Sequence, residues 1–506
     1  MTASHLEVET TLEPPEADPT WALPVDRLRD LPGVDRVVEP PPVTLRARYH
    51  DTTGLALLRA GLTLRRREGG ADAGWHLKLP AEGGRLEQHA PLTAVDGPVP
   101  APLLGLSRSR HRDLPLVVVA QLRTERRTVL LTAADGTVLA EVADDTVAAE
   151  VPPAVAADGG TARPGWRELE VELVAGDDDL RRAAVDVLLA AGATTSTHPS
   201  KVGRALAAAG AGPRLAPPGP GTPGASGGDG AAAVLLAAVV RHRETLLVQD
   251  PLVRLDAPDA VHSMRVACRR LRSLLAAFRP QLDPAVSEPL REELRWLGQV
   301  LGGPRDAEVV RARLATRLGE LPAGGGDRVW PAPPAAPGAV AALDGARYLQ
   351  LLAALDGFVA DPPVVAHRGR RRGTRRAARH AYRRVARALA AVPAAPGPEQ
   401  DTAWHEVRKA TERLRYTCEA VTTVHGAPAR RLARRAEALQ ERLGEHQDSV
   451  LARDVLRGAA GRTDDRDETF LLGTLAGLEL ASARAVLADL DRPVRRLHRA
   501  AARWFD

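Results

Sequence analysis

The chain has 506 residues, about three times the ~150 residues of a typical domain, so we expect two or three separate cores. Hydrophobic residues make up 44% and charged residues 26%, and no uninterrupted apolar run approaches the ~18 residues of a membrane-spanning helix, which predicts a soluble protein. Residues 1–13 lack the features of a secretory signal, and the only cysteines, Cys268 and Cys418, have no C-x-x-C partner. We therefore expect a cytoplasmic protein without disulfides or a thiolate metal site.

Two residue classes are scarce. Aromatic residues make up only 3%, so few side chains can stack on nucleic-acid bases. Of the 69 basic residues only Lys78, Lys201 and Lys409 are lysines, and the remainder are arginines. Because an ammonium group differs from a guanidinium in reach, hydration and pKa range, these three positions are candidates for special roles.

Residues 3–210 have the pattern of β-strands. Alternating polar and apolar residues at 6–11, 75–79 and 168–173 place charged groups on one face of each strand, and residues 117–131 and 138–145 predict further strands. An Asp135-Gly136 hairpin turn precedes Thr137. Segments 24–31 and 180–191 predict helices that cover the apolar outside. We expect an antiparallel α+β domain with a charged interior.

Residues 211–230 predict a flexible linker, because they are mostly Pro, Gly, Ala and Ser and cannot form a core. Residues 1–215 hold 24 basic and 30 acidic residues, a net charge of −6, whereas residues 216–506 hold 45 and 34, a net charge of +11. Further loops are expected at 321–338 and 392–398. The total charge of +5 therefore combines an acidic half and a basic half.

Residues 231–503 predict helices and contain an internal repeat. The pattern H-x-x-R-x4-R-L-R occurs at residues 262–272 and again at 405–415, an offset of 143. Leu301-Gly302 and Leu443-Gly444 follow in the same order at an offset of 142. The repeat predicts two helical bundles, each too small to bury its own apolar face and therefore packed on the other.

Acidic and basic side chains share the predicted strand faces in the first half. With a period of two, Glu7 and Glu9 share one face, and Glu168, Glu170 and Glu172 share another. Carboxylates this close repel unless a cation lies between them, and Mg²⁺ prefers such oxygen ligands. Carboxylates for a metal and cations for phosphate in one interior predict a polyphosphate site. The alternative is a solvated sheet face with ordinary cross-strand ion pairs.

Several motifs resemble the CYTH domain of the triphosphate tunnel metalloenzymes. They are Glu7-x-Glu9, residues 49–52, residues 62–67, His76-Leu77-Lys78, residues 141–145 and residues 168–172. The resemblance covers residues 3–210 and implies an eight-stranded antiparallel tunnel that hydrolyses a terminal phosphoanhydride. By position it implies catalytic roles for Glu7, Glu9, Glu170 and Lys78. It implies Glu7, Glu9, Asp145, Glu168 and Glu170 as ligands of Mg²⁺ or Mn²⁺, and Arg65, Arg67, Lys78, Arg127, Lys201 and Arg204 as phosphate-binding residues.

Two positions depart from the family pattern. The family signature is E-x-E-x-K, and Thr11 stands at the lysine position; Thr63 stands at a second basic position. Losing a cation weakens substrate binding or transition-state stabilisation, in which one donor is worth on the order of 10²-fold or more. The two departures therefore bear on the expected activity and not on the expected fold.

The helical half carries basic stripes. At 100° per residue, His262, Arg265, Arg269 and Arg272 lie within about 80° of arc, and His405, Arg408 and Arg415 repeat the stripe with Glu412 in place of one arginine. Residues 367–387 form a third basic stretch without any acid. Such a density of like charge repels unless an anion compensates it. The alternative, a solvated face with i to i+4 acid partners, suits Arg430 to Arg435 near Glu437.

This half resembles the CHAD domain, which often follows a CYTH domain, over residues 231–503. The resemblance implies a pair of four-helix bundles whose basic groove binds inorganic polyphosphate. The candidate binding residues are His262, Arg265, Arg269, Arg270, Arg272, His405, Arg408, Lys409, Arg413 and Arg415. Neighbouring cations should keep these histidines largely neutral. Metal binding by His262 or His405 is disfavoured, since no second ligand lies at ligand spacing.

Three functional hypotheses follow. The first is a hydrolase of inorganic triphosphate or polyphosphate, with polyphosphate bound by the helical domain. The second is a non-enzymatic polyphosphate-binding or targeting protein with an inactive tunnel. The third, nucleic-acid binding, is disfavoured by the few aromatic residues and the lack of a base-reading motif. We expect no membrane partner and a cytoplasmic location that includes polyphosphate granules, and the sequence leaves the oligomeric state open.

Overall fold

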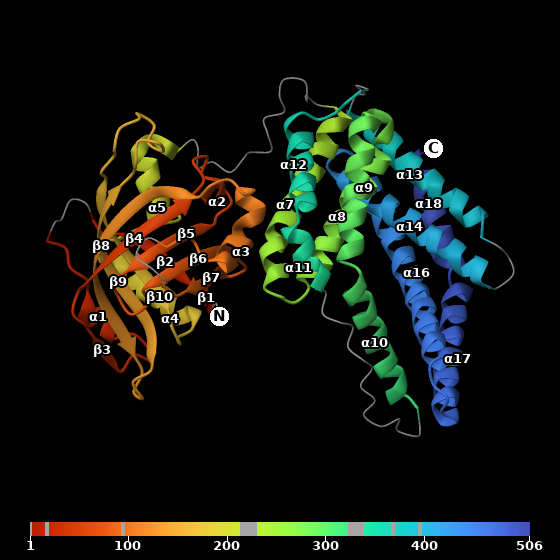
Figure 1. The fold of residues 1–506 in the computed structure, drawn as a ribbon, viewed down its shortest axis with the longest axis horizontal. Helices are drawn as coiled ribbons and strands as arrows, with labels where there is room; N and C mark the ends of the chain where they lie inside the picture. The colour runs from red at the N-terminus through yellow and green to blue at the C-terminus, as the bar shows by residue number, and fades with distance from the viewer. Residues whose placement is uncertain are drawn as a thin grey trace. The chain divides into compact units, whose positions relative to one another are not determined.

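The structure, a computed structural model, describes residues 3–15, 20–92, 97–212, 230–321, 337–365, 370–392 and 397–505. The chain divides into two compact units, residues 1–219 and 220–506. Each unit is described by itself, and Figure 1 shows the ribbon of both. The first contains the β-strands and the second is helical, as the sequence predicted.

The first unit is built on one antiparallel sheet. Its strands are β1 (Ala3–Glu7), β2 (Glu9–Glu13), β3 (Arg36–Val38), β4 (Val43–Asp51), β5 (Thr63–Glu68), β6 (Gly74–Ala81), β7 (Gly84–Ala90), β8 (Val117–Thr132), β9 (Val138–Glu150), β10 (Gly165–Leu173) and β11 (Thr194–Thr195). Its helices are α1 (Val25–Arg29), α2 (Ala56–Arg59), α3 (Ala101–His111), α4 (Asp178–Ala190), α5 (Lys201–Leu206) and a π turn at Ala207–Ala211. The strands expected from sequence are all present.

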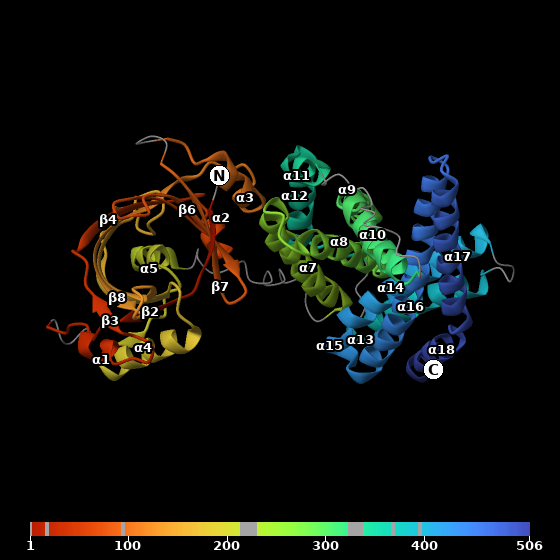
Figure 2. The same ribbon diagram turned by 90° about the horizontal axis from the view of Figure 1, so that it is seen from below.

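The segment Ala3–Glu13 brings the two ends of the curled sheet together. The strand order is β1-β7-β6-β5-β4-β8-β9-β10-β2-β11, so β1 pairs with β7 while β2 pairs with β10. Only Val8 separates β1 from β2, and its carbonyl accepts a hydrogen bond from Leu173 N at 3.1 Å. Counted as one strand, with the short β3 and β11 set aside, β1–β2 and the others make an eight-strand curl. Figure 2 shows this curl in cross-section.

Apolar residues pack on both sides of the sheet. Outside, α1 and α4 cover strands β8, β9 and β10, with Leu28, Val142 and Leu188 fully buried. Inside, α5 lies within the curl (Figure 2) and packs Val202 and Leu206 against inward residues of β4, β8 and β9. The sequence analysis did not predict that α5 enters the interior. Because α5 fills part of the interior with apolar groups, the charged groups occupy the remaining part.

The second unit is helical throughout its described residues. Its helices are α7 (Ala231–Arg254), α8 (Ala260–Ala277), α9 (Pro284–Val300), α10 (Gly303–Gly319), α11 (Pro337–Asp344), α12 (Ala346–Ala360), α13 (Arg370–Ala390), α14 (Pro398–Ala420), α15 (Thr422–His425), α16 (Ala427–Ala460), α17 (Arg466–Ala488) and α18 (Asp491–Phe505), with a 3₁₀ turn at Arg279–Gln281. The repeated motifs start in the first turns of α8 and in α14. The second repeat differs in one respect: Gly302 separates α9 from α10, whereas Gly444 lies inside the continuous α16.

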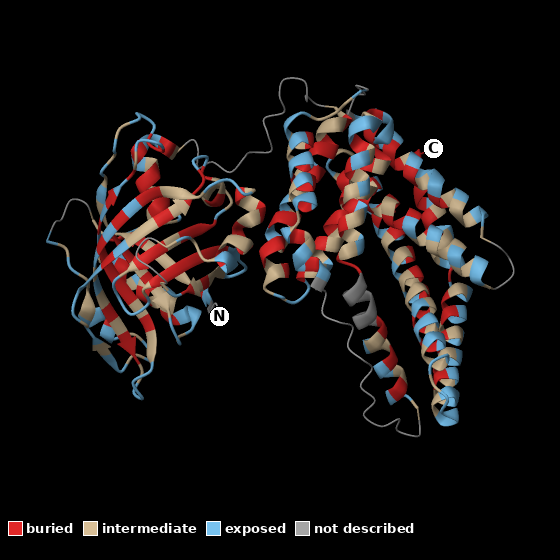
Figure 3. Ribbon diagram, viewed as in Figure 1, coloured by how far each residue is buried: buried red, intermediate tan, exposed pale blue. Residues whose placement is uncertain are grey.

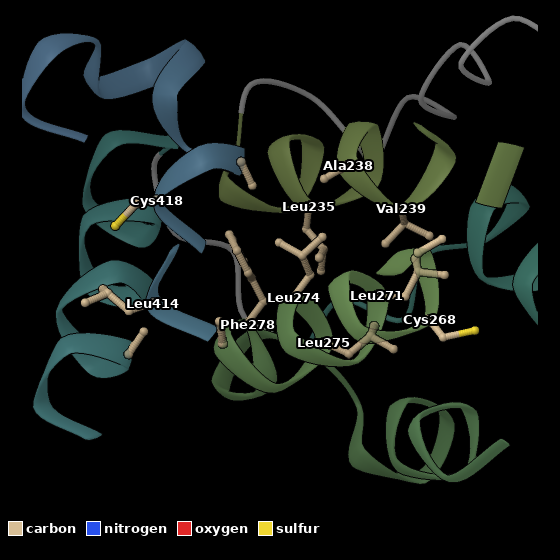
Figure 4. Packing of buried hydrophobic residues seen from close by; sticks show 14 of the residues in the cluster. Leu235, Ala238, Val239, Cys268, Leu271, Leu274, Leu275, Phe278, Leu414 and Cys418 are labelled. Carbon is tan, nitrogen blue, oxygen red and sulfur yellow. The ribbon is translucent and has the colours of Figure 1, made fainter. Parts of the chain in front are cut away.

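One apolar core joins the two repeats. It includes Leu235 on α7, Leu274 on α8, Leu352 on α12, Leu414 on α14 and Leu497 on α18. Figure 4 shows Leu271, Leu274 and Phe278 of α8 near Leu235 and Val239 of α7, with Leu414 and Cys418 on the neighbouring α14. The packing of one repeat on the other is thus as predicted. Cys268 and Cys418 are buried and form no disulfide.

One stretch corrects the expectation about apolar runs. Residues 466–505 contain an 18-residue window with a mean hydropathy of 1.5, long and apolar enough by composition to cross a membrane, although only 28% of it is buried. Core helices of soluble proteins pass the same test. Here α17 buries Leu472 and Leu475 against Leu456 of α16 and Leu314 of α10. Figure 3 shows that the lower end of the α16–α17 pair, where α16 ends and α17 begins, is mostly exposed or half-buried.

Candidate functional site: a charged tunnel and a basic helical cluster

Strand alternation directs charged side chains into the curl. On β10, Leu169 and Val171 point outward to the helices that cover the sheet, and Glu168, Glu170 and Glu172 alternate with them. The same period of two turns Lys78 on β6 inward. The result is a cavity of about 370 Å³ whose wall is mostly charged or hydroxyl-bearing.

Most of the sequence-predicted tunnel residues line this cavity. They are Glu7, Glu9, Arg65, Arg67, Lys78, Glu170 and Lys201. Six further charged residues on the wall were not named as site residues: Asp72, Arg85, Glu87, Arg126, Glu141 and Glu172. Glu141 and Glu172 belonged to the alternating acidic patterns, and Arg85 and Glu87 alternate on β7, so a systematic count of period-two positions would have found them.

Arg127 is a correction. It is exposed on the outer face of β8, and Arg126 points into the cavity in its place. Arg126 makes hydrogen bonds of 2.8 and 2.7 Å to the two carboxylate oxygens of Asp145 and one of 2.6 Å to Glu170. Adjacent residues of a strand face opposite sides of the sheet, so only one of the two arginines can point inward. Which one does so depends on the register of β8 in the sheet, which the sequence of β8 alone does not specify.

Three carboxylates meet around the Lys201 ammonium. Candidate ligand oxygens of Asp145, Glu168 and Glu170 all lie within 4.8 Å of one another, close enough to hold a metal ion. Lys201 Nζ lies 3.0 Å from Asp145 and 2.7 Å from Glu168, and also contacts Glu170. Burial alone would lower the pKa of Lys201, but the three carboxylates raise it well above its ordinary value. Lys201 and Arg126 therefore already neutralise this cluster.

The opposite wall is also ion-paired. Lys78 Nζ contacts Glu7, and Arg65 lies 3.7 Å from Glu87. His76 Nδ1 lies 2.9 Å from the same Glu87 oxygen. Burial, partly offset by the Glu87 hydrogen bond, lowers the pKa of His76 to about 4, so His76 is neutral at pH 7.

Two carboxylates have no cation against them. Glu9 on β2 lies directly opposite Glu172 on β10, and no ion pair of either is found among the described residues. Burial, and then the neighbouring Glu7, raises the pKa of Glu172 to about 7, and Lys78 offsets only part of this rise. Burial and Glu170 likewise raise the pKa of Glu9. One oxygen of Glu7, Oε2, is buried without a hydrogen bond.

The remaining predicted residues lie beside the cavity. Asp145 and Glu168 are buried behind its wall, with exposed fractions of 0% and 2%. Arg204 is held 3.0 Å from Glu13 and 5.2 Å from the centre of the Trp166 ring. Thr11 and Thr63, at the positions where the resemblance led us to expect cations, both line the cavity.

In the helical unit, three of the ten predicted binding residues pair with Glu412 or Glu419. Arg270 donates a 2.8 Å hydrogen bond to Glu419, which also accepts one of 2.8 Å from Arg415. Arg269 lies 3.4 Å from Glu412. The contacts of Arg269 and Arg270 join α8 to α14 and place acids of α14 against predicted binding residues of α8. They assign Arg269, Arg270 and Arg415 to the interface between the repeats.

A second set of arginines is only partly paired. Arg291 and Arg295 pair with Glu288 and Glu292 one turn earlier on α9, whereas no ion pair of Arg272, Arg384 or Arg413 is found among the described residues. Burial, together with Arg384, Arg291 and Arg272, lowers the pKa of Arg413 to about 10. Burial also lowers the pKa of Arg272, with Arg295 and Arg291 as the nearest like charges. These five residues come from α8, α9, α13 and α14, and we call them the arginine cluster. The sequence named Arg272 and Arg413 as binding candidates and placed Arg384 in the third basic stretch, whereas Arg291 and Arg295 were missed.

The third basic stretch is partly structural. Residues 366–369 lie outside the described residues. On α13, Arg375 donates a 2.7 Å hydrogen bond to the Trp504 carbonyl, and Arg379 donates to the Phe505 carbonyl. Cations at the end of α18 satisfy carbonyls that have no partner within that helix.

The two repeated histidines differ in surroundings. His405 lines a cavity of about 470 Å³ between α14, α16 and α17, together with His446. Burial, and then Lys409, lowers the pKa of His405, in line with the predicted neutral state. His262 is exposed on α8, where Arg265 donates a 3.2 Å hydrogen bond to the Gly302 carbonyl. Arg408 is half-buried beside His405, and Lys409 pairs with Glu406.

Comparisons with known proteins agree with this architecture. The family model described as CYTH domain matches residues 26–204, and the one described as CHAD domain matches residues 237–457. Two uncharacterized proteins of Mycobacterium tuberculosis, from strains CDC 1551 and H37Rv, are each 36% identical over 537 residues, covering 100% of this chain and 98% of the relative.

Two solved structures are similar in part. PptA from Streptomyces chartreusis is 21% identical, with a TM-score of 0.42, and the match covers 54% of this chain and 99% of that chain. The CHAD domain from the plant Ricinus communis is 24% identical, with a TM-score of 0.38, covering 53% and 90%. The CYTH domain has a triphosphate tunnel fold, and the CHAD domain is linked to polyphosphate. The two family models and the full-length relatives show that this chain belongs to the proteins in which a CYTH domain is followed by a CHAD domain.

Proposed function

We propose that the CYTH domain hydrolyses inorganic triphosphate, or a related triphosphate or polyphosphate, with a divalent metal, and that the CHAD domain binds polyphosphate. The observation that carries the first part is the cavity itself. Six cations and seven carboxylates line it, among them Lys78 and Arg126 for phosphate and Glu9 and Glu172 for metal. An apolar ligand would remove water from these charged groups without offering any of them a partner, whereas a metal-bound phosphate chain offers groups of both signs.

The donor set fits Mg²⁺ or Mn²⁺. Such hard cations take carboxylate oxygens, and Glu7, Glu9 and Glu172 present them from neighbouring strands without a compensating cation at Glu9 or Glu172. The sequence-predicted ligand Glu170 adjoins this set, while Asp145 and Glu168 support it through Lys201. A bound metal would supply charge for the phosphate oxygens and remove the repulsion that raises the pKa of Glu9 and Glu172.

The chain's own residues then bind and orient the phosphate groups. Arg65, Lys78 and Arg126 are fixed by ion pairs to the wall, so their positions are set before the ligand arrives. Hydrolysis forms a bond from water oxygen to the terminal phosphorus and breaks the phosphoanhydride bond, whose bridging oxygen leaves with the electron pair. Charge develops on the phosphate oxygens, where preorganised cations stabilise it most.

Phosphate release from tripolyphosphate by the full chain tests the enzyme hypothesis. We expect Mg²⁺- or Mn²⁺-dependent release, and a loss of about 10²-fold or more for Glu9→Gln, because a metal ligand is removed without a change in size. Glu150→Gln, on the outside of β9, is the control and should keep full activity. Absence of metal-dependent release, or equal activity of Glu9→Gln, contradicts the proposal.

A second candidate, a tunnel that binds phosphate without hydrolysis, rests on Thr11 and Thr63. Both line the cavity with a neutral hydroxyl group. If the missing cation limits turnover, Thr11→Lys should raise phosphate release while binding of polyphosphate by the full chain stays the same. Unchanged turnover in Thr11→Lys, together with binding of tripolyphosphate by the unmodified chain, favours the binding function.

Support for polyphosphate binding comes from the arginine cluster. Five guanidinium groups from four helices share one region, and their mutual repulsion lowers the pKa of Arg413 and Arg272 after the effect of burial. A polyanion removes this repulsion and releases counterions, so its binding should be strong at low salt.

A further inference from the structure

Arg85 differs from the other cations of the tunnel in its partners. Lys78 contacts Glu7, Arg65 lies near Glu87, and Arg67 contacts Asp72. Arg126 and Lys201 share the buried carboxylates of β9 and β10. Each of these five cations therefore already has an anion against it.

Arg85 is held by neutral oxygens instead. Its Nη2 donates a hydrogen bond of 2.9 Å to the Gly61 carbonyl and one of 3.4 Å to Thr63 Oγ1. Among the residues that the structure describes, no carboxylate lies within ion-pair distance of it. A guanidinium has five N–H donors in a fixed fork, and these two contacts leave most of them for a ligand.

Its place on the wall is defined by the sheet. Arg85 lies on β7 directly opposite Glu7 of β1 and opposite Pro80 of β6. Thr63, which it contacts, is opposite Lys78 on the neighbouring pair of strands. The guanidinium thus reaches past Pro80, which offers no side-chain donor, to the cavity wall beside Lys78.

We propose that Arg85 binds a phosphate group of the tunnel ligand and supplies the uncompensated positive charge of the wall. An anion that meets Lys78 or Arg126 must compete with a carboxylate already in place, whereas Arg85 needs no ion pair to be broken. This inference rests on the proposed function, and it assigns to Arg85 uniform binding of the ligand instead of a part in bond cleavage.

Titration of tripolyphosphate with Mg²⁺ into the full chain tests it, using Arg85→Gln. The variant removes the positive charge while keeping a polar side chain with an amide donor at this position. A charge-assisted hydrogen bond is worth about 1.5–3 kcal/mol, so we expect the Kd to rise roughly tenfold to a hundredfold. If the chain is active, KM should rise by a similar factor with kcat nearly unchanged. Arg27→Gln, an exposed arginine on α1, is the control.

Relocating the charge separates binding from support of the fold. In the double variant Arg85→Gln/Thr63→Arg a guanidinium returns to the same wall from β5, and we expect most of the lost affinity to return. An Arg85→Gln variant that binds as tightly as the unmodified chain, or a double variant as weak as Arg85→Gln, overturns the inference. If the unmodified chain does not bind tripolyphosphate, the proposed function fails, and the inference fails with it.

Discussion

The two domains arrange their charges in opposite ways. In the CYTH domain cations and carboxylates are buried together, and the single ammonium group of Lys201, for example, contacts three carboxylates. In the CHAD domain the arginine cluster gathers like charges, and the lowered pKa of Arg413 reflects that crowding in addition to burial. A balanced, desolvated wall discriminates between ligands by geometry, whereas a cluster with an excess of positive charge attracts any polyanion through long-range electrostatics. Ligand binding in the CYTH tunnel should therefore depend on metal and pH, and ligand binding at the arginine cluster should depend on salt.

The largest expected effect is a difference in stability loss between two variants, each of which replaces one lysine in one of the two domains. Lys201→Met leaves Asp145, Glu168 and Glu170 facing one another in a buried site, and breaking such a buried network costs about 3–5 kcal/mol. Lys409→Met removes a half-exposed i to i+3 pair with Glu406, which is worth about 0–1 kcal/mol. Urea unfolding followed by circular dichroism, with separate β-sheet and α-helical signals, measures both. Equal destabilisation would contradict the contrast.

A smaller effect is expected from pH. Burial, and then Arg48 and Arg66, lowers the pKa of His50 to about 4, so the folded state favours the neutral ring. A lowered histidine pKa stabilises the fold above the unfolded value of about 6.5, and that stability is lost as pH falls from 6.5 toward 4. Between pH 7 and pH 5, the free energy of unfolding should therefore fall by about 1–2 kcal/mol less in His50→Gln than in the unmodified chain. His5→Gln, an exposed histidine on β1, is the control, and identical pH dependence of both variants would refute this cause.

The smallest expected effect distinguishes two arginines of the CHAD domain. Arg413→Gln removes a member of the arginine cluster and should weaken binding of long-chain polyphosphate severalfold, lowering the slope of log Kd against log salt by about one. Arg270→Gln removes a residue already paired with Glu419 and stacked 4.6 Å from the centre of the Tyr416 ring. It should leave the slope nearly unchanged. The reverse ranking would place the binding surface on the interface between α8 and α14.

The sequence predicted the tunnel residues where strand alternation decided their direction. Glu7, Glu9 and Lys78 alternate with apolar residues along their strands. The apolar neighbours mark one face of the sheet, so these charged residues must lie on the other. Arg126 and Arg127 are adjacent, and only the register of β8 against β9 decides which one meets Asp145. The resemblance alone does not resolve such a choice.

Partners distant in sequence were the other limit. Arg270 and Glu419 are 149 positions apart, and their pairing depends on how α8 packs against α14. Helical periodicity describes one helix at a time, so the stripe was visible and its neutralisation was not. In the same way, the six-residue α5 gives too short a pattern to predict that it would enter the sheet and place Lys201 among the carboxylates.

The most direct measurement is calorimetric titration of tripolyphosphate into the full chain, with and without Mg²⁺, at low and high salt. The account predicts two classes of site. One requires metal, tolerates salt and is lost in Glu9→Gln; the other needs no metal and is lost at high salt. A single class of salt-sensitive, metal-independent sites, unchanged in Glu9→Gln, would contradict the account.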